Sequence, residues 1–272
     1  MHRIDIDEIL RQRAPRFEKY VPRRVRDWLR RTLHERELNE ILAAGEGCSP
    51  QEFIRTAFAK MRIGYRIEGL DRLDPAGRYL FAANHPFGGM DGMMIADALI
   101  DRFGDARVVV NDLLLFVEPL RPIWLPVNKH GRQNADYVRR YEEAFAGDLP
   151  ILTFPAGLCS RQRHGEVSDT CWHLNFVKRA RASQRTVVPL YVEGRLSDFF
   201  YRLARWRERL GMKFNIEMLW LPDEMFRQSG GRFRIVAGDP IAPGDLTGSL
   251  RRQADTVRRE VYRLKERLSC RH

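Results

Sequence analysis

Short apolar runs alternate with amphipathic stretches along most of the chain, and this alternation restricts the fold more than any other feature. Residues 79–83 and 186–192 have the length and composition of buried strands. Further strand-like runs occupy residues 65–70, 108–110, 151–154 and 233–236. Apolar residues at helical spacing fill the intervals, at about 90–103, 134–146, 172–182, 196–210 and 249–268. Strands that alternate with helices predict an α/β domain with a mostly parallel sheet flanked by helices.

The N-terminal region has a helical pattern instead. Residues 5–45 carry helical spacing that Pro15 and Pro22 interrupt, so two or three short helices are expected there. Ser49 followed by Pro50 has the pattern of an N-cap with proline at the first helical position, which predicts a helix over about residues 50–62. The sequence therefore predicts a helical N-terminal segment over residues 1–62 and an α/β domain over residues 63–272.

The composition disfavours two classes of protein. The chain has 272 residues, of which 44% are hydrophobic and 31% charged, a balance typical of a folded globular protein. No stretch reaches the roughly 18 uncharged apolar residues of a spanning helix, and residues 1–8 lack the apolar segment of a secretory signal. We therefore expect neither an integral membrane protein nor a secreted one.

The cysteines and glycines give no support for a metal or a cofactor. The four cysteines are scattered without a CxxC pair, which fits a reducing compartment. Neither a P-loop nor a GxGxxG fingerprint is present, so no cofactor is predicted. One loose cluster of cysteines and histidines matches no zinc-binding spacing, and no metal is predicted there; it comprises Cys159, His164, Cys171 and His173.

Positive charge is concentrated at the two ends of the sequence. Residues 1–36 hold 11 Lys and Arg against 6 Asp and Glu, and residues 251–272 hold 8 against 3, which accounts for 10 of the net charge of +11. Basic ends suit an anionic membrane surface, an acidic protein partner or nucleic acid, but they are equally expected of solvated, arginine-rich helices. No nucleic-acid-binding motif accompanies the charge, so nucleic acid is not predicted as a partner.

The densest group of reactive side chains lies in residues 83–92, between a predicted strand and a predicted helix. Strand-to-helix turns at a sheet edge are where α/β folds place reactive groups. His85 is the natural general base for a hydroxyl, and Asp91 would hold its tautomer and stabilise the imidazolium. This loop contains no Ser or Cys, so direct transfer is favoured over a covalent intermediate. The alternative is a glycine-rich turn whose His and Asp only cap the following helix.

At these residues the sequence resembles the PlsC-like glycerolipid and lysophospholipid acyltransferases. The first motif of that family is Asn-His followed by an Asp after four residues. Asn84, His85 and Asp91 match it with five intervening residues, and the flexible pair Gly88 and Gly89 can absorb the extra one.

The third and fourth motifs of the family follow in order. The third, Phe-Pro-Glu-Gly with a nearby Arg and Ser, corresponds to residues 154–161, where Ala156 replaces the glutamate and Cys159 stands at the expected arginine. The resemblance implies that Arg161 takes over the role of that arginine. The fourth is an apolar strand that ends at Pro189, with Gly194 beyond it. Residues 126–132 hold the place of the second motif, and the resemblance covers roughly residues 60–245.

The resemblance implies a glycerolipid acyltransferase-like fold and acyl transfer from a thioester of acyl-carrier protein or coenzyme A to the hydroxyl of a lyso-lipid. The two loops together look like the subgroup that O-acylates N-(3-hydroxyacyl) amino acids, which makes glycine or ornithine lipids. His85 and Asp91 are then the catalytic pair. The substrate-binding residues that the resemblance implies are Asn84, Gly88, Gly89, Phe154, Pro155, Gly157, Ser160 and Arg161.

Within this resemblance, Arg161 is expected to pair with the carboxylate of the acceptor, unless it makes an ordinary structural ion pair. Backbone N–H groups near Gly157 are expected as oxyanion donors. The main alternative is a 1-acylglycerol-3-phosphate acyltransferase, and Ala156 counts against it because the third motif helps to bind the acceptor phosphate in this family. A non-catalytic membrane-binding protein on the same fold is a further alternative.

A lipid acceptor requires access to a bilayer. Residues 198–210 place Phe199, Leu203, Trp206 and Leu210 on one stripe and arginines elsewhere, which is typical of an interfacial helix but also of a helix packed on the sheet. The basic N-terminal helices are a second candidate for the membrane surface. We expect a peripheral enzyme at the cytoplasmic face of the inner membrane, or a cytoplasmic one.

Overall fold

The chain forms two compact units in the computed structural model. One consists of Met1–Ile63, Phe116–Leu120 and Leu196–Gly231, and we call it the helical unit. The other consists of Gly64–Leu115, Arg121–Arg195 and Arg232–His272, and we call it the sheet unit. The structure describes residues 4–13, 21–127, 135–163, 165–212 and 215–269.

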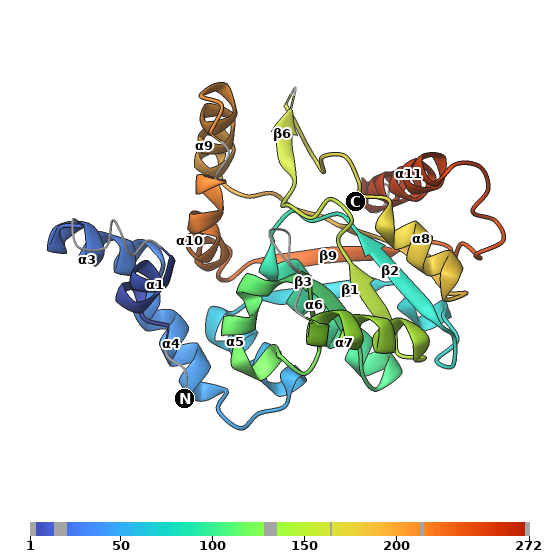
Figure 1. The fold of residues 1–272 in the computed structure, drawn as a ribbon, viewed down its shortest axis with the longest axis horizontal. Helices are drawn as coiled ribbons and strands as arrows, with labels where there is room; N and C mark the ends of the chain where they lie inside the picture. The colour runs from blue at the N-terminus through green and yellow to red at the C-terminus, as the bar shows by residue number, and fades with distance from the viewer. Residues whose placement is uncertain (1–3, 14–20, 128–134, 164, 213–214, 270–272) are drawn as a thin grey trace. The chain divides into compact units, whose positions relative to one another are not determined.

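The sheet unit is built on seven strands in the order β1-β9-β8-β2-β5-β3-β4 (Figure 1). Neighbouring strands are parallel except for β8 and β9, which are antiparallel, so the expected mostly parallel sheet is confirmed. The strands are β1 (Gly64–Glu68), β2 (Tyr79–Ala83), β3 (Arg107–Asn111), β4 (Trp124–Val127), β5 (Ile151–Thr153), β8 (Thr186–Val192) and β9 (Arg232–Ala237).

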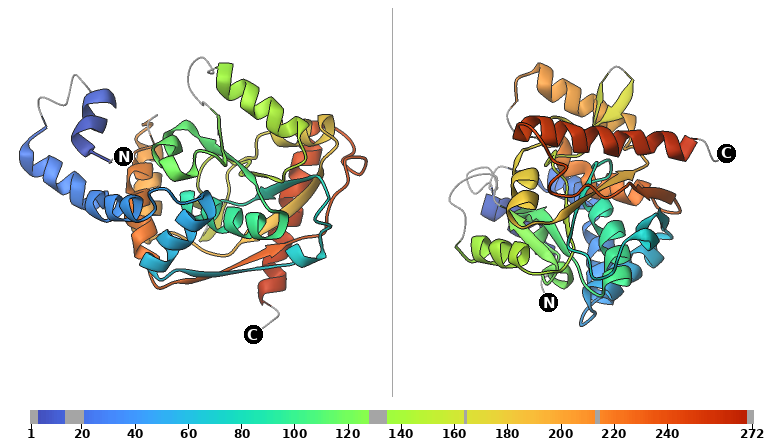
Figure 2. Two further views of the ribbon diagram at one scale, coloured as in Figure 1. Left: turned by 90° about the horizontal axis from the view of Figure 1, so that it is seen from below. Right: turned by 90° about the vertical axis from the view of Figure 1, so that its right-hand side faces the viewer.

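Helices cover both faces of this sheet. Leu80 and Ala82 of β2 face a core that they share with α7, α8 and α11, whereas Tyr79 and Phe81 contact Phe103 of α6. This alternation is the period of two that a strand imposes on its side chains. Figure 2 shows α6 and α11 on opposite sides of the sheet. The bounds are α6 (Gly89–Phe103), α7 (Ala135–Ala146), α8 (Asn175–Ala182) and α11 (Leu250–Ser269), with short 3-10 helices η1 (Leu70–Arg72) and η2 (Asp112–Phe116).

Three strands of the structure were not predicted from the sequence pattern. β4 contains Pro126, which weakens its strand signal; within the described residues β4 is an edge strand, where a missing N–H is tolerated. β6 (Arg161–Arg163) and β7 (Glu166–Ser168) form a short antiparallel pair of mostly polar residues, which shows no apolar alternation.

Most of the segment assigned to the second motif, from residue 128 onward, lies outside the described residues, as does His164.

The helical unit confirms the helices expected before residue 62. Ser49 closes a capping box, because its hydroxyl accepts the N–H of Glu52 while its own N–H donates to the Glu52 carboxylate. Among the described helices, none is both long and apolar enough to cross a membrane. The helices of this unit are α1 (Ile6–Arg13), α3 (Arg23–Thr32), α4 (Glu35–Ala44), α5 (Pro50–Met61), α9 (Asp198–Arg209) and α10 (Leu221–Arg227), with η3 (Glu118–Leu120) and η4 (Ile216–Trp220).

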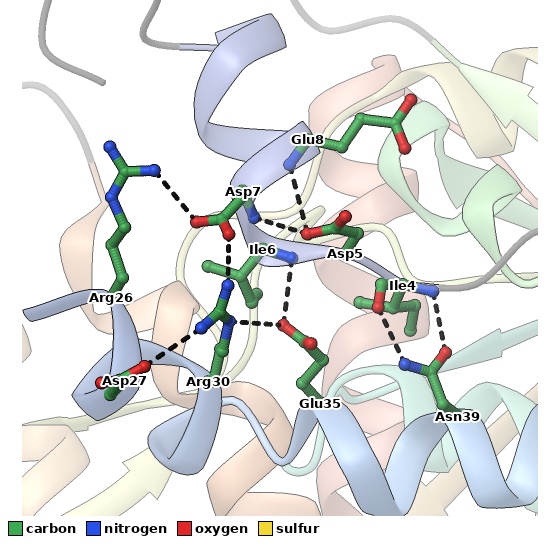
Figure 3. A network of polar contacts seen from close by, with 10 residues as sticks. All are labelled: Ile4, Asp5, Ile6, Asp7, Glu8, Arg26, Asp27, Arg30, Glu35 and Asn39. Carbon is green, nitrogen blue, oxygen red and sulfur yellow. Dashed lines mark hydrogen bonds and ion pairs between the residues drawn. The ribbon is translucent and has the colours of Figure 1, made fainter. Parts of the chain in front are cut away.

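A polar network ties the first helices together (Figure 3). The carboxylate of Asp7 on α1 pairs with Arg26, at 3.3 Å, and with Arg30, both on α3. Asn39 of α4 exchanges two hydrogen bonds of 2.8 Å with the backbone of Ile4. The helical unit also takes in the later segment Leu196–Gly231, and the domain boundary placed at residue 62 stays a prediction.

Candidate active site

The predicted reactive residues lie where two neighbouring parallel strands end. β2 ends at Ala83 and continues into Asn84 and His85, while β5 ends at Thr153 and continues into Phe154. Because the carboxyl ends of parallel strands meet at one edge of the sheet, the loops that carry the first and third motifs lie together there.

The structure brings His85 and Asp91 together despite the extra residue between them. Nδ1 of His85 lies 3.0 Å from Oδ2 of Asp91, although the ring N–H does not point straight at that oxygen. Gly88 has a φ of 74°, a conformation that favours glycine, and it turns the chain into α6, whose first turn holds Asp91. The five-residue spacing therefore keeps the pair within ion-pair distance.

Asp91 is a completely buried carboxylate. Its Oδ2 accepts the backbone N–H of Phe87 at 2.9 Å, while Oδ1 has no hydrogen-bond partner among the described residues. Burial raises the pKa of Asp91, and the interaction with His85 opposes that rise. The first turn of a helix also favours a negative charge. This environment suits a carboxylate that holds the imidazole and stabilises the imidazolium.

Phe154 stacks on the imidazole of His85. The ring centroids are 4.0 Å apart and the planes differ by 27°. The face of an aromatic ring attracts a cation, so this contact suits a ring that carries a positive charge during proton transfer. Since Asp91 lies at the Nδ1 side, Nε2 is the ring nitrogen left to accept a proton. The side chain of His85 is 17% exposed, which leaves it accessible.

Asn84 and Gly194 fix the His85 loop against the end of β8. Asn84 is buried, donates to the carbonyl of Val192 at 2.9 Å and accepts the N–H of Val192 at 2.7 Å. A Cβ atom at Gly194 would lie 1.9 Å from the ring of Phe87, so only glycine leaves room for that ring. Asn84 therefore serves the loop structure, and its contact with substrate stays a prediction.

The two predicted glycines at the start of α6 differ in their surroundings. Gly88 is required by its positive φ. A Cβ atom at Gly89 would meet no atom of the described residues within 4 Å, so the surface is open at this point. Close approach of a substrate to Gly89 is thus compatible with the structure and stays a prediction.

The loop of residues 154–161 is folded by its own backbone. Gly157 has a φ of 63° and donates its N–H to the carbonyl of Phe154 at 2.9 Å. Ser160 donates its N–H to the carbonyl of His85 at 2.8 Å. The N–H groups of Gly157 and Ser160 are therefore already bonded within the protein, and the expectation of oxyanion donors near Gly157 stays a prediction for the other N–H groups of this loop.

The remaining predicted residues of this loop are buried. Pro155 and Ser160 lie inside the sheet unit, and Arg161 is only 4% exposed. Arg161 donates from Nη1 to the carbonyl of Cys159 at 2.7 Å. Ser160 donates its hydroxyl to Asp169 at 2.6 Å. Contact of these residues with substrate stays a prediction.

Asp169 belongs to this site although no sequence pattern identifies it. It follows β7, accepts the backbone N–H of His85 at 3.2 Å and is buried. Burial raises the pKa of its carboxyl group, which hydrogen bonds from Ser160 and Trp172 oppose. A single Asp in a polar loop carries no signal in the sequence, and only its contact with the His85 loop shows its place.

A family model described as acyltransferase matches residues 8–271. The chain belongs to this acyltransferase family. The predicted family and the predicted acyl-transferring enzyme are thus confirmed.

Two relatives match this acyltransferase over nearly their whole length. The lyso-glycine lipid O-acyltransferase of Phocaeicola vulgatus is 39% identical over 264 residues, which cover 96% of this chain and 95% of the relative. The protein of the same name from Bacteroides thetaiotaomicron is 36% identical over 96% of this chain and 97% of its own. The solved structure of the 1-acyl-sn-glycerophosphate acyltransferase PlsC from Thermotoga maritima is 17% identical, with a TM-score of 0.48, over 79% of this chain and 78% of that one. A similarity as distant as the last says nothing about the acceptor.

Proposed function

We propose that this acyltransferase completes a glycine lipid, by moving a fatty acyl group from a thioester to the 3-hydroxyl of an N-(3-hydroxyacyl)glycine. The names of the two relatives, at 39% and 36% identity over 96% of the chain, support a lyso-glycine lipid as acceptor. The observation that carries the chemistry is the contact of 3.0 Å between His85 and Asp91 at the carboxyl edge of the sheet. The motifs suggest an amino-acid head group, and the names of the two relatives support glycine in particular.

In this proposal His85 is the general base. Nε2 takes the proton of the acceptor hydroxyl as the hydroxyl oxygen attacks the carbonyl carbon of the thioester. When the tetrahedral intermediate collapses, the C–S bond breaks, the new C–O ester bond remains, and the imidazolium gives its proton to the departing thiolate. Asp91 and Phe154 stabilise the imidazolium between these steps.

Arg161 is proposed to hold the carboxylate of the acceptor. Arg161 directly follows Ser160, whose N–H donates to the carbonyl of His85. Arg161 is therefore part of a loop that contacts the proposed base. A guanidinium matches a carboxylate through two parallel hydrogen bonds. Ala156, which is buried, stands where the family has a glutamate, so that position places no negative charge near an anionic head group.

The helical unit carries a surface that we propose to contact the bilayer. α9 buries Phe200, Tyr201 and Ala204. In its other stripe Trp206 and Leu210 are 65% and 58% accessible, whereas Leu203 is half-buried. The predicted apolar stripe of this helix is therefore distinct from the face that packs within the protein.

An aromatic strip extends this surface to α3. The ring of Trp220 lies 5.8 Å from that of Phe199 and 6.0 Å from that of Trp28, and both Phe199 and Trp28 are exposed. Exposed aromatic residues among basic ones fit the interface of an anionic bilayer, which corresponds to a peripheral enzyme at the cytoplasmic face of the inner membrane. Exposed arginines on the two helices are Arg23, Arg24, Arg31, Arg202, Arg205 and Arg209.

An acyl-transfer assay with wild type and His85→Ala tests the proposed reaction. Acyl-carrier-protein and acyl-coenzyme A thioesters would each be offered with N-(3-hydroxyacyl)glycine, its ornithine counterpart and lysophosphatidic acid. We expect transfer to the glycine acceptor that disappears in His85→Ala, and the better thioester identifies the donor. Transfer to lysophosphatidic acid alone would establish the 1-acylglycerol-3-phosphate activity instead. A folded protein that acylates none of the three would contradict the proposal.

A further inference from the structure

Asp169 connects the two loops that carry the proposed catalytic residues. Its Oδ1 accepts two hydrogen bonds, from the hydroxyl of Ser160 at 2.6 Å and from the backbone N–H of His85 at 3.2 Å. Its Oδ2 accepts a third from Nε1 of Trp172 at 2.9 Å. Asp169 follows β7, so it comes from a third segment of the chain and bridges the other two.

These contacts close a ring of three hydrogen bonds. His85 donates its N–H to Asp169, Asp169 accepts the hydroxyl of Ser160, and Ser160 donates its N–H back to the carbonyl of His85 at 2.8 Å. The peptide groups on both sides of His85 are therefore held. Because these two groups fix the direction of the Cα–Cβ bond, the ring sets the imidazole in place beside Asp91.

The donors around Asp169 favour a side chain with two acceptor oxygens. A backbone N–H and an indole N–H can only donate, so both oxygens of Asp169 have to accept. An asparagine at this position would direct its amide hydrogens at the indole of Trp172 or at the backbone N–H of His85. In either orientation the amide N–H group would face another N–H donor. A carboxylate has only acceptor oxygens at these positions and avoids this conflict.

α11 fixes Asp169 from the other side. The N–H of Asp169 donates to the hydroxyl oxygen of Tyr262 at 2.6 Å, and its carbonyl accepts Nη2 of Arg258 at 3.0 Å. Arg258 and Tyr262 are one turn apart on this 20-residue helix. The backbone of Asp169 is thus anchored on a long helix, which is a rigid support for the ring.

We propose that Asp169 is a positioning residue, which fixes the backbone of His85 through the ring with Ser160 and so sets the imidazole for proton transfer. The proposal rests on the proposed role of His85 as general base. Asp169 is buried and acts through His85, so its loss is expected to lower kcat and to leave KM nearly unchanged.

Steady-state acyl transfer by variants of the full chain tests this role. We expect Asp169→Asn to lower kcat by about 10–100-fold, with KM within about threefold of wild type, because a small misplacement of a catalytic group has effects of this size. The matched control is Asp97→Asn, which removes a buried carboxylate on α6 that accepts the hydroxyl of Tyr65. Asp97→Asn is expected to keep kcat within about twofold of wild type, since Asp97 is outside the ring.

A second pair of variants tests the ring even where Asp169→Asn does not fold. Ser160→Ala removes one side of the ring, and we expect kcat to fall by about tenfold or more. Trp172→Phe removes a donor from the other oxygen of the same carboxylate and leaves the ring closed, so kcat should stay within about threefold although stability falls. The double variant Asp169→Asn, Ser160→Ala should lose no more kcat than Asp169→Asn alone, because both changes break one unit.

The outcomes separate this inference from the proposed function. An active His85→Ala would overturn the role of His85 as base, and the role of Asp169 with it. An inactive His85→Ala together with wild-type kcat in Asp169→Asn or Ser160→Ala would overturn the inference alone. Equal losses of kcat in Ser160→Ala and Trp172→Phe would do the same, because they would indicate a general structural role.

Discussion

The ring of Phe87 occupies the space that a side chain at position 194 would need. An added Cβ atom on Gly194 would lie 1.9 Å from Cζ of Phe87, and Gly194 has a φ of 153°. The ring also packs edge-on against Phe233, with centroids 4.9 Å apart, which restricts its movement. Since Phe87 donates its N–H to Asp91, this fit couples the loop after β8 to the proposed catalytic pair.

Gly194→Ala is therefore expected to disturb both folding and catalysis. Overpacking of a buried site lowers the free energy of unfolding by about 1–3 kcal/mol, which urea denaturation would measure. Shortening the ring should relieve the clash, so Phe87→Leu in the Gly194→Ala background is expected to recover part of the stability. A Gly194→Ala variant as stable as wild type would contradict this account.

Asp91→Asn is expected to lower kcat by at least about 100-fold, because an amide cannot stabilise the imidazolium and can favour the wrong tautomer. Circular dichroism would establish that the variant is folded, and steady-state transfer would give kcat. The contact of 3.0 Å between Asp91 and His85 motivates the prediction. Activity close to that of wild type would mean that Asp91 only caps α6.

The buried carboxylates also predict a pH dependence of stability. Burial raises the pKa values of Asp91 and Asp169 above the ordinary value of 3.8, so the folded protein binds these protons more tightly than the unfolded chain does. Proton binding by these two carboxyl groups stabilises the folded state most when the pH is below the ordinary pKa. This stabilisation is lost as the pH rises through their raised pKa values.

Asp91→Asn removes one of these titrations. We therefore expect the stability of this variant, relative to wild type, to increase as the pH rises from the ordinary value of 3.8 through the raised pKa of Asp91. Urea denaturation of both proteins across this range provides the measurement. A difference that stays constant with pH would show that the carboxyl group of Asp91 titrates equally in both states.

The proposed role of Arg161 predicts a preference for a charged acceptor. Wild type should use N-(3-hydroxyacyl)glycine with a kcat/KM about 10–100-fold above that of its methyl ester. This ratio corresponds to the free energy of a hydrogen bond to a charged group. In Arg161→Ala this ratio should approach one. Arg163→Ala, two residues further along β6 and exposed, is the matched control and should keep the preference.

The exposed stripe of α9 predicts binding to anionic vesicles. Trp206→Ser with Leu210→Ser should weaken co-sedimentation with such vesicles by about tenfold or more, because both side chains would lie in the acyl boundary. The control is Val138→Ser on α7, which removes an exposed apolar side chain of the sheet unit and should leave binding unchanged. Equal binding by the double variant and wild type would exclude α9 from the membrane surface.

Local patterns predicted the parts of this molecule that depend on local interactions. The N-cap at Ser49, the strands β2 and β8 and the loop that starts at Asn84 all follow from neighbouring residues. The pairing of His85 with Asp91 could be predicted because both residues lie in the turn that leads into α6. Such features are decided within a few residues, so a single sequence contains the information.

The parts that escaped prediction depend on distant segments. Asp169 lies 84 residues from His85 in the chain, and its importance comes only from where the hairpin of β6 and β7 places it. β4 tolerates Pro126 only because of its position at the sheet edge. The N–H of Gly157 is occupied because its loop turns back on Phe154, a backbone conformation that residue types do not specify.

The anchoring of Asp169 by Arg258 and Tyr262 has a consequence for the order in which the site is completed during synthesis. α11 is synthesised after all seven strands of the described sheet, because β9 ends at Ala237 and α11 begins at Leu250. Before that step the ring around His85 lacks its support on α11. A chain that stops before residue 258 would therefore carry the His85 and Asp91 motif but lack both contacts that hold the backbone of Asp169.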